Sequence, residues 1–305
     1  MSFTQGKAFK VVKATASDFM DDNAPRLAAA LAYYALLSLA PLVVLALAVA
    51  GLMLDEEAAR GGIARELGNL VGSAGGQAVE NIVKNAQAPA AGIISTVMGL
   101  VVLLFGASGV FGELEAALDT IWEVAPRPGR GILGMIRDRL FSFAMVMGVA
   151  FLLLVSLVVS AAVAAVGRFL SSALPGGEVM WQGLNFVISL GVVTALFAVM
   201  FKTVPHAKVA WRDVWVGAFV TALLFTLGKL LIGLYLGKTS FSSAYGAAGS
   251  LVLLVIWVYY SASILLLGAE FTQAYAIYYG SRIEPSEDAI RAERPRNASL
   301  TERRS

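Results

Sequence analysis

The stretch SSAYGAAGSLVLLVIWVYYSASILLLGAEF, residues 242–271, decides the fold class. From Thr239 to Ala269 the sequence has no Asp, Glu, Lys, Arg or His, and Glu270 then ends the run. About 20 consecutive apolar residues are enough for a helix to cross the roughly 30 Å hydrocarbon core of a bilayer. The run is longer than that, and its surplus lies in the Ser- and Gly-rich beginning. The sequence therefore predicts a membrane-spanning helix that is preceded by a re-entrant or irregular segment, or that crosses a neighbour closely.

The rest of the chain follows the same pattern. Of its 305 residues, 58% are hydrophobic and only 14% are charged, whereas a soluble domain is about 25% charged. Long apolar runs predict six transmembrane helices, within residues 27–54, 85–112, 140–167, 179–201, 214–237 and 239–269. The fifth run contains one charge, Lys229. We therefore predict an all-α fold, a polytopic bundle of six transmembrane helices.

Lysine and arginine are unevenly distributed between the two faces that these spans would define. One face carries 17 of them and the opposite face five. Cytoplasmic loops are enriched in Lys and Arg, and an even number of spans places both termini on one side. Both termini are therefore predicted to be cytoplasmic, and the net charge of +2 is explained by the membrane surface rather than by nucleic acid.

Three regions follow from this topology. Residues 27–280 are the expected transmembrane domain. Residues 1–26 are expected to lie in the inner interface, because Phe9, Val12, Ala16 and Phe19 have helical spacing between lysines; a solvated tail fits the same pattern. Residues 281–305 are expected to be a disordered basic tail, because Arg, Glu, Pro and Ser dominate from Glu284 onward.

Several residues inside the predicted spans favour bending or close helix packing. A proline inside a helix leaves a carbonyl without its donor and kinks the helix, and small residues let helices approach closely in lipid. The candidate hinge or packing residues are Pro41, Gly99, Gly106, Gly233, Gly246 and Gly249.

Lys229 is the leading candidate for a substrate or ion pathway. It lies on a stripe of small residues with Thr226, about 12 Å from the outer end of its helix. Side chains on a helix tilt toward its amino terminus, which is the inner end here, so an outward reach of the lysine would oppose that tilt. We expect Lys229 to face a buried or water-filled site that binds an anionic group; snorkelling to the outer headgroups is the alternative.

Three carboxylates complete the candidate pathway. Glu113 and Asp119, with Glu115 between them, are expected at the cytoplasmic mouth, either as a cation or proton site or as hydrated interfacial groups. Glu270 ends a polar stripe on the last span. We expect it to be a structural anchor paired with Arg137 or Arg139, and a transport carboxylate is the alternative. Glu270 and Lys229 are too far apart along their helices to touch.

No catalytic centre, metal site or cofactor site is predicted. The chain has no cysteine and one histidine, His206, so a cluster of metal ligands able to activate water is not expected. A phosphate-binding P-loop sequence is also missing, so the chain alone is not expected to drive transport with ATP.

Several segments resemble the YihY/BrkB family of bacterial inner-membrane proteins. The resemblance covers about residues 7–280 and is carried by AALAYYALLSLAPL, GVFGELEAALDTIWEV, VPHAKVAWRDVWVGA and SAYGAAGSLVLLVIWVYYSASILLLGAEFTQAY. It implies a six-span bundle in the cytoplasmic membrane. The family is named for a serum-resistance factor and once carried a ribonuclease label, which the single histidine does not favour.

The sequence therefore favours a transporter, exporter or flippase-like protein for a small or amphipathic molecule, and an anionic one is among the candidates. A membrane scaffold or envelope-assembly partner is the alternative. The expected partners are membrane lipids and such a substrate, without nucleic acid, and the sequence leaves the oligomeric state open.

Overall fold

The structure is a computed structural model of the whole chain, and it describes residues 2–50, 61, 109–128, 177–238, 249–280 and 283–292. The predicted third span, most of the predicted second span and the segment before Gly249 lie outside these residues. Gly99, Gly106 and Gly246 lie there too, and so do the two arginines proposed as partners of Glu270.

Helices dominate the described part of the chain. They are α1 (Ser2–Asp21), α2 (Ala24–Ala50), α6 (Gly177–Thr203), α7 (Trp211–Lys238) and α9 (Gly249–Tyr278), and residues 109–121 are also helical. Within the described residues, three helical segments are long and apolar enough to cross a membrane: Phe186–Thr203, Trp211–Ile232 and Leu254–Tyr278. The predicted mostly helical membrane protein is confirmed. The count of six spans and the side on which the termini lie stay predictions.

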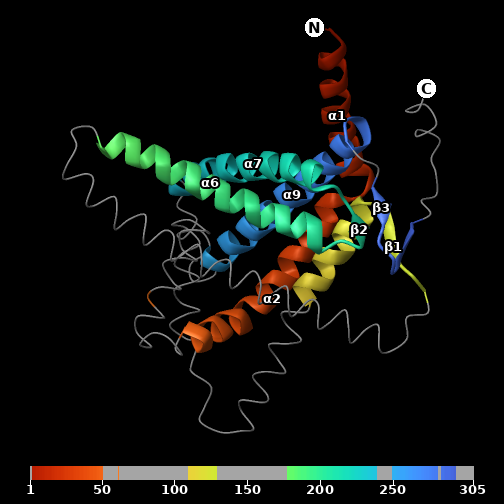
Figure 1. Cartoon of the computed structure of the whole chain (residues 1–305). Coiled ribbons are helices and arrows are strands. Elements are labelled where there is room, and N and C mark those ends of the chain that lie inside the picture. The colour runs from red at the N-terminus through yellow and green to blue at the C-terminus, as the bar shows by residue number, and fades with distance from the viewer. Residues whose placement is uncertain are drawn as a thin grey trace.

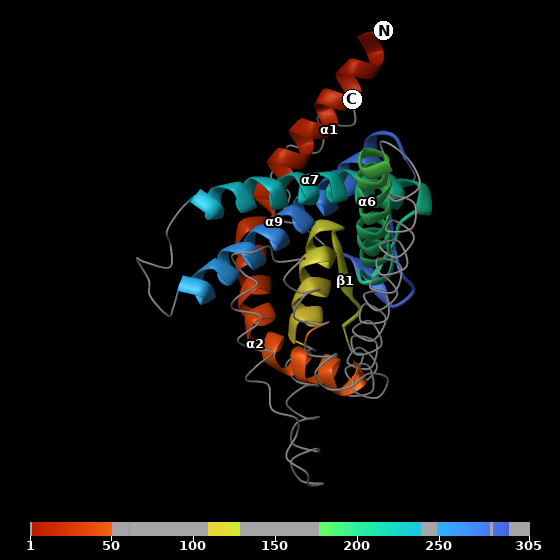
Figure 2. The same cartoon turned by 90° about the vertical axis from the view of Figure 1, so that its left-hand side faces the viewer.

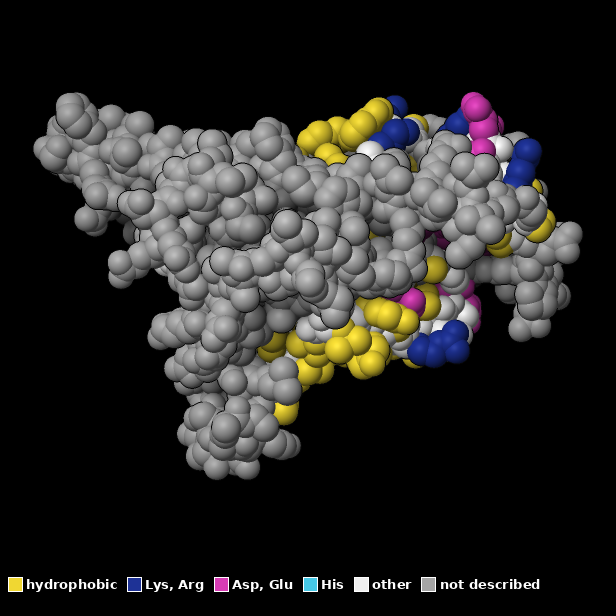
Figure 3. Space-filling view, turned by 90° about the horizontal axis from the view of Figure 1, so that it is seen from below, with side chains coloured by type: hydrophobic (Ala, Val, Ile, Leu, Met, Phe, Trp, Pro, Cys, Tyr) yellow, Lys and Arg dark blue, Asp and Glu magenta, His cyan; other side chains and the backbone are white. Residues whose placement is uncertain are grey.

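The described helices converge at one end and spread apart at the other (Figures 1 and 2). We call the converging end the strand end, because residues 122–128, 204–210 and 283–292, which contain all four described strands, lie there. In Figure 1, α1 runs across the direction of α6 and α7 rather than along it. Seen from below, the charged side chains of the described residues gather toward the strand end, and hydrophobic side chains cover the neighbouring surface (Figure 3).

Short strands join the chain after α9 to two earlier turns. β1 (Val124–Pro126) pairs antiparallel with β4 (Ala289–Arg291), and β2 (Ala207–Lys208) pairs antiparallel with β3 (Glu284–Pro285). The expectation of disorder from residue 281 onward is therefore wrong for residues 283–292. Their polar composition does not bury much apolar surface, but the two turns offer backbone groups that these residues can pair with. Residues 293–305 lie outside the described part.

Helix boundaries follow from local chemistry. Asn23 ends α1 in the left-handed conformation, with φ 54°, which Asn tolerates better than most residues. Pro25 follows in the first turn of α2, where its missing N–H has no helical partner to lose. Glu123 adopts a similar φ of 55° after the helical residues 109–121. Each of these residues redirects the chain at a helix end.

One apolar cluster holds the strand end together. It contains buried residues of α2, residues 114–124, α6, α7 and α9. Large members include Phe201, Leu118 and Leu266, which are fully buried. The Trp122 ring packs against Phe201 with centroids 5.9 Å apart. Among the α6 side chains whose burial is described, the buried ones lie at residues 194–201, near the end of the helix where the described helices converge.

α7 and α9 cross through two reciprocal glycine–threonine contacts. Thr272 of α9 lies against Gly217 of α7, and Thr221 of α7 lies against Gly268 of α9. Each threonine hydroxyl donates to the carbonyl of the glycine four residues earlier on its own helix, at 2.7 Å. This satisfies the hydroxyl within the helix, and the missing Cβ of each glycine lets the two backbones approach closely.

α1 has two different faces. Val11 and Ala14 are buried against Ala274 of α9, while Phe9 and Val12 of the predicted apolar face remain exposed. α1 is therefore a helix as predicted, but its contact with α9 uses a neighbouring face. The helical spacing correctly predicted a helix, but the residues that pack against α9 lie on the face next to the predicted apolar one.

Three candidate hinge or packing residues fall on described backbone. Gly249 is the first described residue of α9, and because residues 239–248 lie outside the described part of the chain, the helix start near residues 246–249 stays a prediction. α2 continues through Pro41 and changes direction along its length in Figure 2, although a hinge role for this proline stays a prediction. Gly233 lies within α7.

Candidate functional site at the strand end

Two carboxylates lie on one face of the helical residues 109–121. Glu115 and Asp119 are four residues apart, which places their side chains next to each other on a helix. Asp119 is only 5% exposed, and the Glu115 side chain is 18% exposed. The pair therefore points into the protein at the strand end rather than into bulk solvent.

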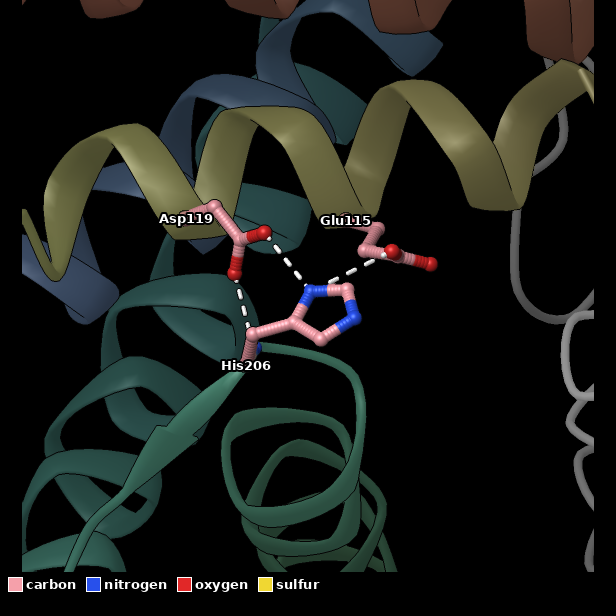
Figure 4. Close-up of side chains that lie close together, drawn as sticks. All are labelled: Glu115, Asp119 and His206. Carbon is pink, nitrogen blue, oxygen red and sulfur yellow. Dashed lines mark hydrogen bonds and ion pairs between the residues drawn. The ribbon is translucent and has the colours of Figure 1, made fainter. Parts of the chain in front are cut away.

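His206 meets this pair from the turn between α6 and β2 (Figure 4). Its Nδ1 lies 2.8 Å from Asp119 Oδ2 and 3.3 Å from Glu115 Oε1. Pro205 precedes it and cannot continue the i to i−4 hydrogen bonding of α6, so α6 ends at Thr203 and the chain turns. Two segments that are 87 residues apart in sequence are thus joined.

Backbone contacts fix the position of the histidine. The His206 N–H donates to Asp119 Oδ1 at 2.7 Å, and its carbonyl accepts from the Ser286 N–H at 2.9 Å. The Lys202 ammonium donates to the carbonyl of Val209 on the other side of the turn. The turn that carries His206 is therefore held by the helix with the carboxylates, by α6 and by the chain after α9.

We call Glu115, Asp119 and His206 the carboxylate–histidine cluster. Its three ligand-type atoms lie within 4.8 Å of one another. Such a group can share a proton, orient a water molecule or coordinate a cation. The expectation that the single histidine belongs to no cluster of possible metal ligands is wrong, because the fold brings distant carboxylates to it.

The other candidate pathway residues are spread along the helices. Glu113 is half-buried on the same helix as the cluster but is not a member of it. Glu270 is fully buried in α9, with 0% exposure. Thr226 is half-buried, and its hydroxyl donates to the Ala222 carbonyl at 2.7 Å.

Lys229 is exposed on α7. Its neighbours Leu230 and Leu231 are 60% and 59% exposed, whereas Ala222 of the same small-residue stripe is fully buried. The stripe thus faces the core at the strand end and opens to the surface near Lys229. The expected enclosure of this lysine is not seen among the described residues, and its role in a pathway stays a prediction.

The α7–α9 contacts also place Lys229 relative to Glu270. Gly228 of α7 lies against Tyr260 of α9, while Gly217 lies against Thr272. Lys229 is therefore near the level of Tyr260, ten residues and about 15 Å of helix from Glu270. This agrees with the expectation that the two charges do not touch.

The meeting of His206 with Glu115 and Asp119 was not predicted. From the sequence, His206 served only as an argument against a metal centre, and Glu115 was placed at the cytoplasmic mouth between Glu113 and Asp119. The spacing of four between Glu115 and Asp119 was a usable signal for a two-carboxylate face. Nothing in the sequence indicates that the turn after α6 folds onto that face.

Comparison with known proteins identifies the family. A family model described as "Virulence factor BrkB" matches residues 15–292. The chain belongs to the BrkB virulence factor family. The match includes all three members of the carboxylate–histidine cluster, and it extends to the strands after α9. The resemblance inferred from the sequence is confirmed.

Curated BrkB-like relatives are named only as membrane proteins. The chain is 28% identical over 281 residues to a "UPF0761 membrane protein" of Psychrobacter sp. (strain PRwf-1), covering 91% of this chain and 50% of the relative. It is 30% identical over 273 residues to a UPF0761 membrane protein of Alkalilimnicola ehrlichii, covering 88% and 58%. The chain thus spans about half the length of these relatives. No solved structure matches the chain.

Proposed function

We propose that this BrkB-family protein moves an anionic amphiphile, such as a lipid with a phosphate headgroup, along the face of α7 that carries Lys229. The observation that supports the proposal is a lysine that is exposed between exposed leucines inside the segment Trp211–Ile232, which is apolar enough to span a membrane.

The cost of a charge in hydrocarbon is the physical reason. A lysine about 12 Å from the outer end of a membrane helix is unfavourable there unless its ammonium reaches headgroups, water or an anion. Outward snorkelling opposes the tilt of side chains on a helix whose amino terminus faces inward. An anionic headgroup at Lys229, with acyl chains along Leu230 and Leu231, would add an ion pair to the interaction that Lys229 already makes and would cover the leucines.

The proposal also includes the setting of the protein. We place it in the bacterial cytoplasmic membrane with six spans and both termini inside. Membrane lipids are its partners in this setting. A scaffold for envelope assembly is the second candidate. It is favoured by the closely packed core at the strand end, because apolar side chains of the described helices are buried against one another there.

The test uses the purified full chain in liposomes that contain a fluorescent phosphatidylglycerol or a fluorescent phosphatidylcholine. We expect the protein to accelerate exchange of the anionic probe between leaflets, measured by reduction of the outer-leaflet fluorophore with dithionite. Lys229→Met should abolish the acceleration, because it keeps the volume and removes the charge. Lys229→Arg should retain it, because the charge remains.

Lys208→Met is the matched control. Lys208 is a lysine outside the spans, on β2, and its ammonium lies 3.4 Å from Glu287 in an exposed ion pair, so its loss should not change the exchange rate. Equal rates of lipid exchange for the wild type and Lys229→Met, with both proteins correctly folded, would refute the transport proposal and favour the scaffold.

A further inference from the structure

We propose that Glu115, Asp119 and His206 bind one divalent first-row transition-metal ion, and that Zn²⁺ fits the site best. The cluster offers one imidazole nitrogen and two carboxylate oxygens, all within 4.8 Å. Zn²⁺ takes these ligand types and commonly uses three protein ligands with a fourth position for water. The site does not depend on the transport proposal, because it lies at the strand end and not near Lys229.

The distances suit a small tetrahedral ion. Bonds of about 2.0–2.1 Å from Zn²⁺ to nitrogen and oxygen imply ligand atoms about 3.3 Å apart. His206 Nδ1 and Glu115 Oε1 are already 3.3 Å apart, and Nδ1 and Asp119 Oδ2 are 2.8 Å apart. The two carboxylate oxygens lie within 4.8 Å of each other, so side-chain adjustments at Asp119 and Glu115 would complete the arrangement.

Charge supplies the second argument. Two carboxylates converge on the same ring nitrogen, which carries at most one proton, so a single N–H is shared between two acceptors. The side chains of Asp119 and His206 are only 7% and 17% exposed, and like charges repel more strongly where water is scarce. A divalent cation at this point would bind both carboxylates and the deprotonated Nδ1 at once, and would leave Nε2–H free to donate.

The surroundings pre-orient the ligands. Asp119 uses Oδ1 to accept the His206 backbone N–H at 2.7 Å, which leaves Oδ2 directed at the imidazole. The Ser286 N–H holds the His206 carbonyl at 2.9 Å. Hydrogen bonds that fix first-shell ligands are a regular feature of metal sites. A bound ion would tie the helical residues 109–121 to the turn between α6 and β2.

Metal binding can be measured directly on the full chain in detergent or nanodiscs. Zn²⁺ is titrated in competition with a chromophoric chelator, and we expect one tight site per chain. Glu115→Gln and His206→Gln should each weaken binding by at least about tenfold, since removal of a ligand costs more than removal of an outer-shell partner. Co²⁺ should give the visible absorption bands of a tetrahedral site in the wild type, and these bands should be lost in Glu115→Gln and His206→Gln.

Glu113→Gln is the matched control, because Glu113 is a half-buried carboxylate on the same helix but outside the cluster. It should keep wild-type affinity and the Co²⁺ spectrum. Glu115→Gln preserves side-chain volume at a partly exposed position, so its folding can be verified by circular dichroism and a monodisperse elution profile. If folded wild type binds Zn²⁺ no more tightly than folded Glu115→Gln, the metal site is refuted.

Discussion

At the scale of single residues, the buried carboxylates need a compensating environment. Glu270 is fully buried, and Asp213 is 1% exposed in the first turn of α7, where the helix dipole favours negative charge. Glu270 lies far from either end of α9, so the dipole of its own helix does not stabilise it. The sequence revealed Glu270 because it ends a long uncharged run. Its complete burial depends on α1, α2 and α7 packing around α9. The spacing of residues along the sequence does not predict this packing.

Glu270→Gln tests the structural anchor expected for this residue. Removing the charge while keeping the shape should lower stability by on the order of 3–5 kcal/mol if the carboxylate belongs to a buried pair. The measurement is thermal unfolding of the purified protein in detergent. Glu284→Gln, at an exposed position of β3, should have no measurable effect. An unchanged melting temperature for Glu270→Gln would favour the transport carboxylate instead.

At the scale of elements, helices were predictable and their contacts were only partly so. The apolar run that follows Gly249 predicted the helix α9. α7 and α9 were both expected as spans, yet Gly217, Thr221, Gly268 and Thr272 were not singled out, because the Gly-x-x-x-Thr pattern acquires meaning only when two helices present it to each other. The strands were missed for the same reason, since their two or three residues pair with partners about 80 to 170 positions away.

Gly217→Ala tests the α7–α9 crossing. A Cβ at this position would overlap the side chain of Thr272, and overpacking of a fitted contact costs about 1–3 kcal/mol. We expect a lower melting temperature, and Thr272→Ala in the same background should recover part of the loss because it removes the overlapping hydroxyl and methyl groups. Gly191→Ala in α6, where a Cβ meets nothing within 4 Å, should be neutral or stabilising. Equal effects of the two alanines would contradict the proposed close contact.

The free face of α1 leads to another element-scale prediction. Phe9, Val12 and Met20 are 70%, 62% and 65% exposed, and Lys10 and Lys13 are exposed beside them. Basic amphipathic helices of this kind insert their apolar face at the boundary of headgroups and acyl chains. An environment-sensitive fluorophore on Val12→Cys should therefore emit at shorter wavelength in nanodiscs with anionic lipid than the same fluorophore on Lys208→Cys. Matching spectra, both equally quenched by iodide, would show a solvated helix.

At the scale of the whole molecule, the chain after α9 closes the strand end. β3 and β4 pair with β2 and β1, Ala289 is buried, and Ser286 supports the turn that carries His206. Polar composition alone suggested disorder for this region. The backbone pairing shows why composition was misleading, because strand ladders require partners with free N–H and C=O groups rather than apolar side chains.

Two truncations distinguish the contribution of strands β3 and β4 from that of the residues after them. Deleting residues 293–305 leaves both strand pairs in place and should not change thermal stability. Deleting residues 281–305 removes both pairs and the support of His206, so we expect a lower melting temperature and weaker Zn²⁺ binding. The two proteins are compared in the same detergent by thermal unfolding and by metal titration. Identical behaviour would mean that the strands contribute little to the strand end.

The orientation of the whole molecule can be tested because the chain has no cysteine. The Lys/Arg asymmetry and the charged strand end in Figure 3 favour a strand end that faces the cytoplasm. A single cysteine at Glu287, whose side chain is 91% exposed in the β3–β4 turn, should be protected from a membrane-impermeant maleimide in intact cells and labelled after permeabilisation. A cysteine at Ser73, in the predicted outer loop between the first two spans, should be labelled in both cases. Labelling of both sites in intact cells would place the strand end outside. A third cysteine, at Gly6, then reports the side of the amino terminus. If Gly6→Cys is protected in the same cells, the two ends of the chain lie on opposite sides and the number of spans is odd.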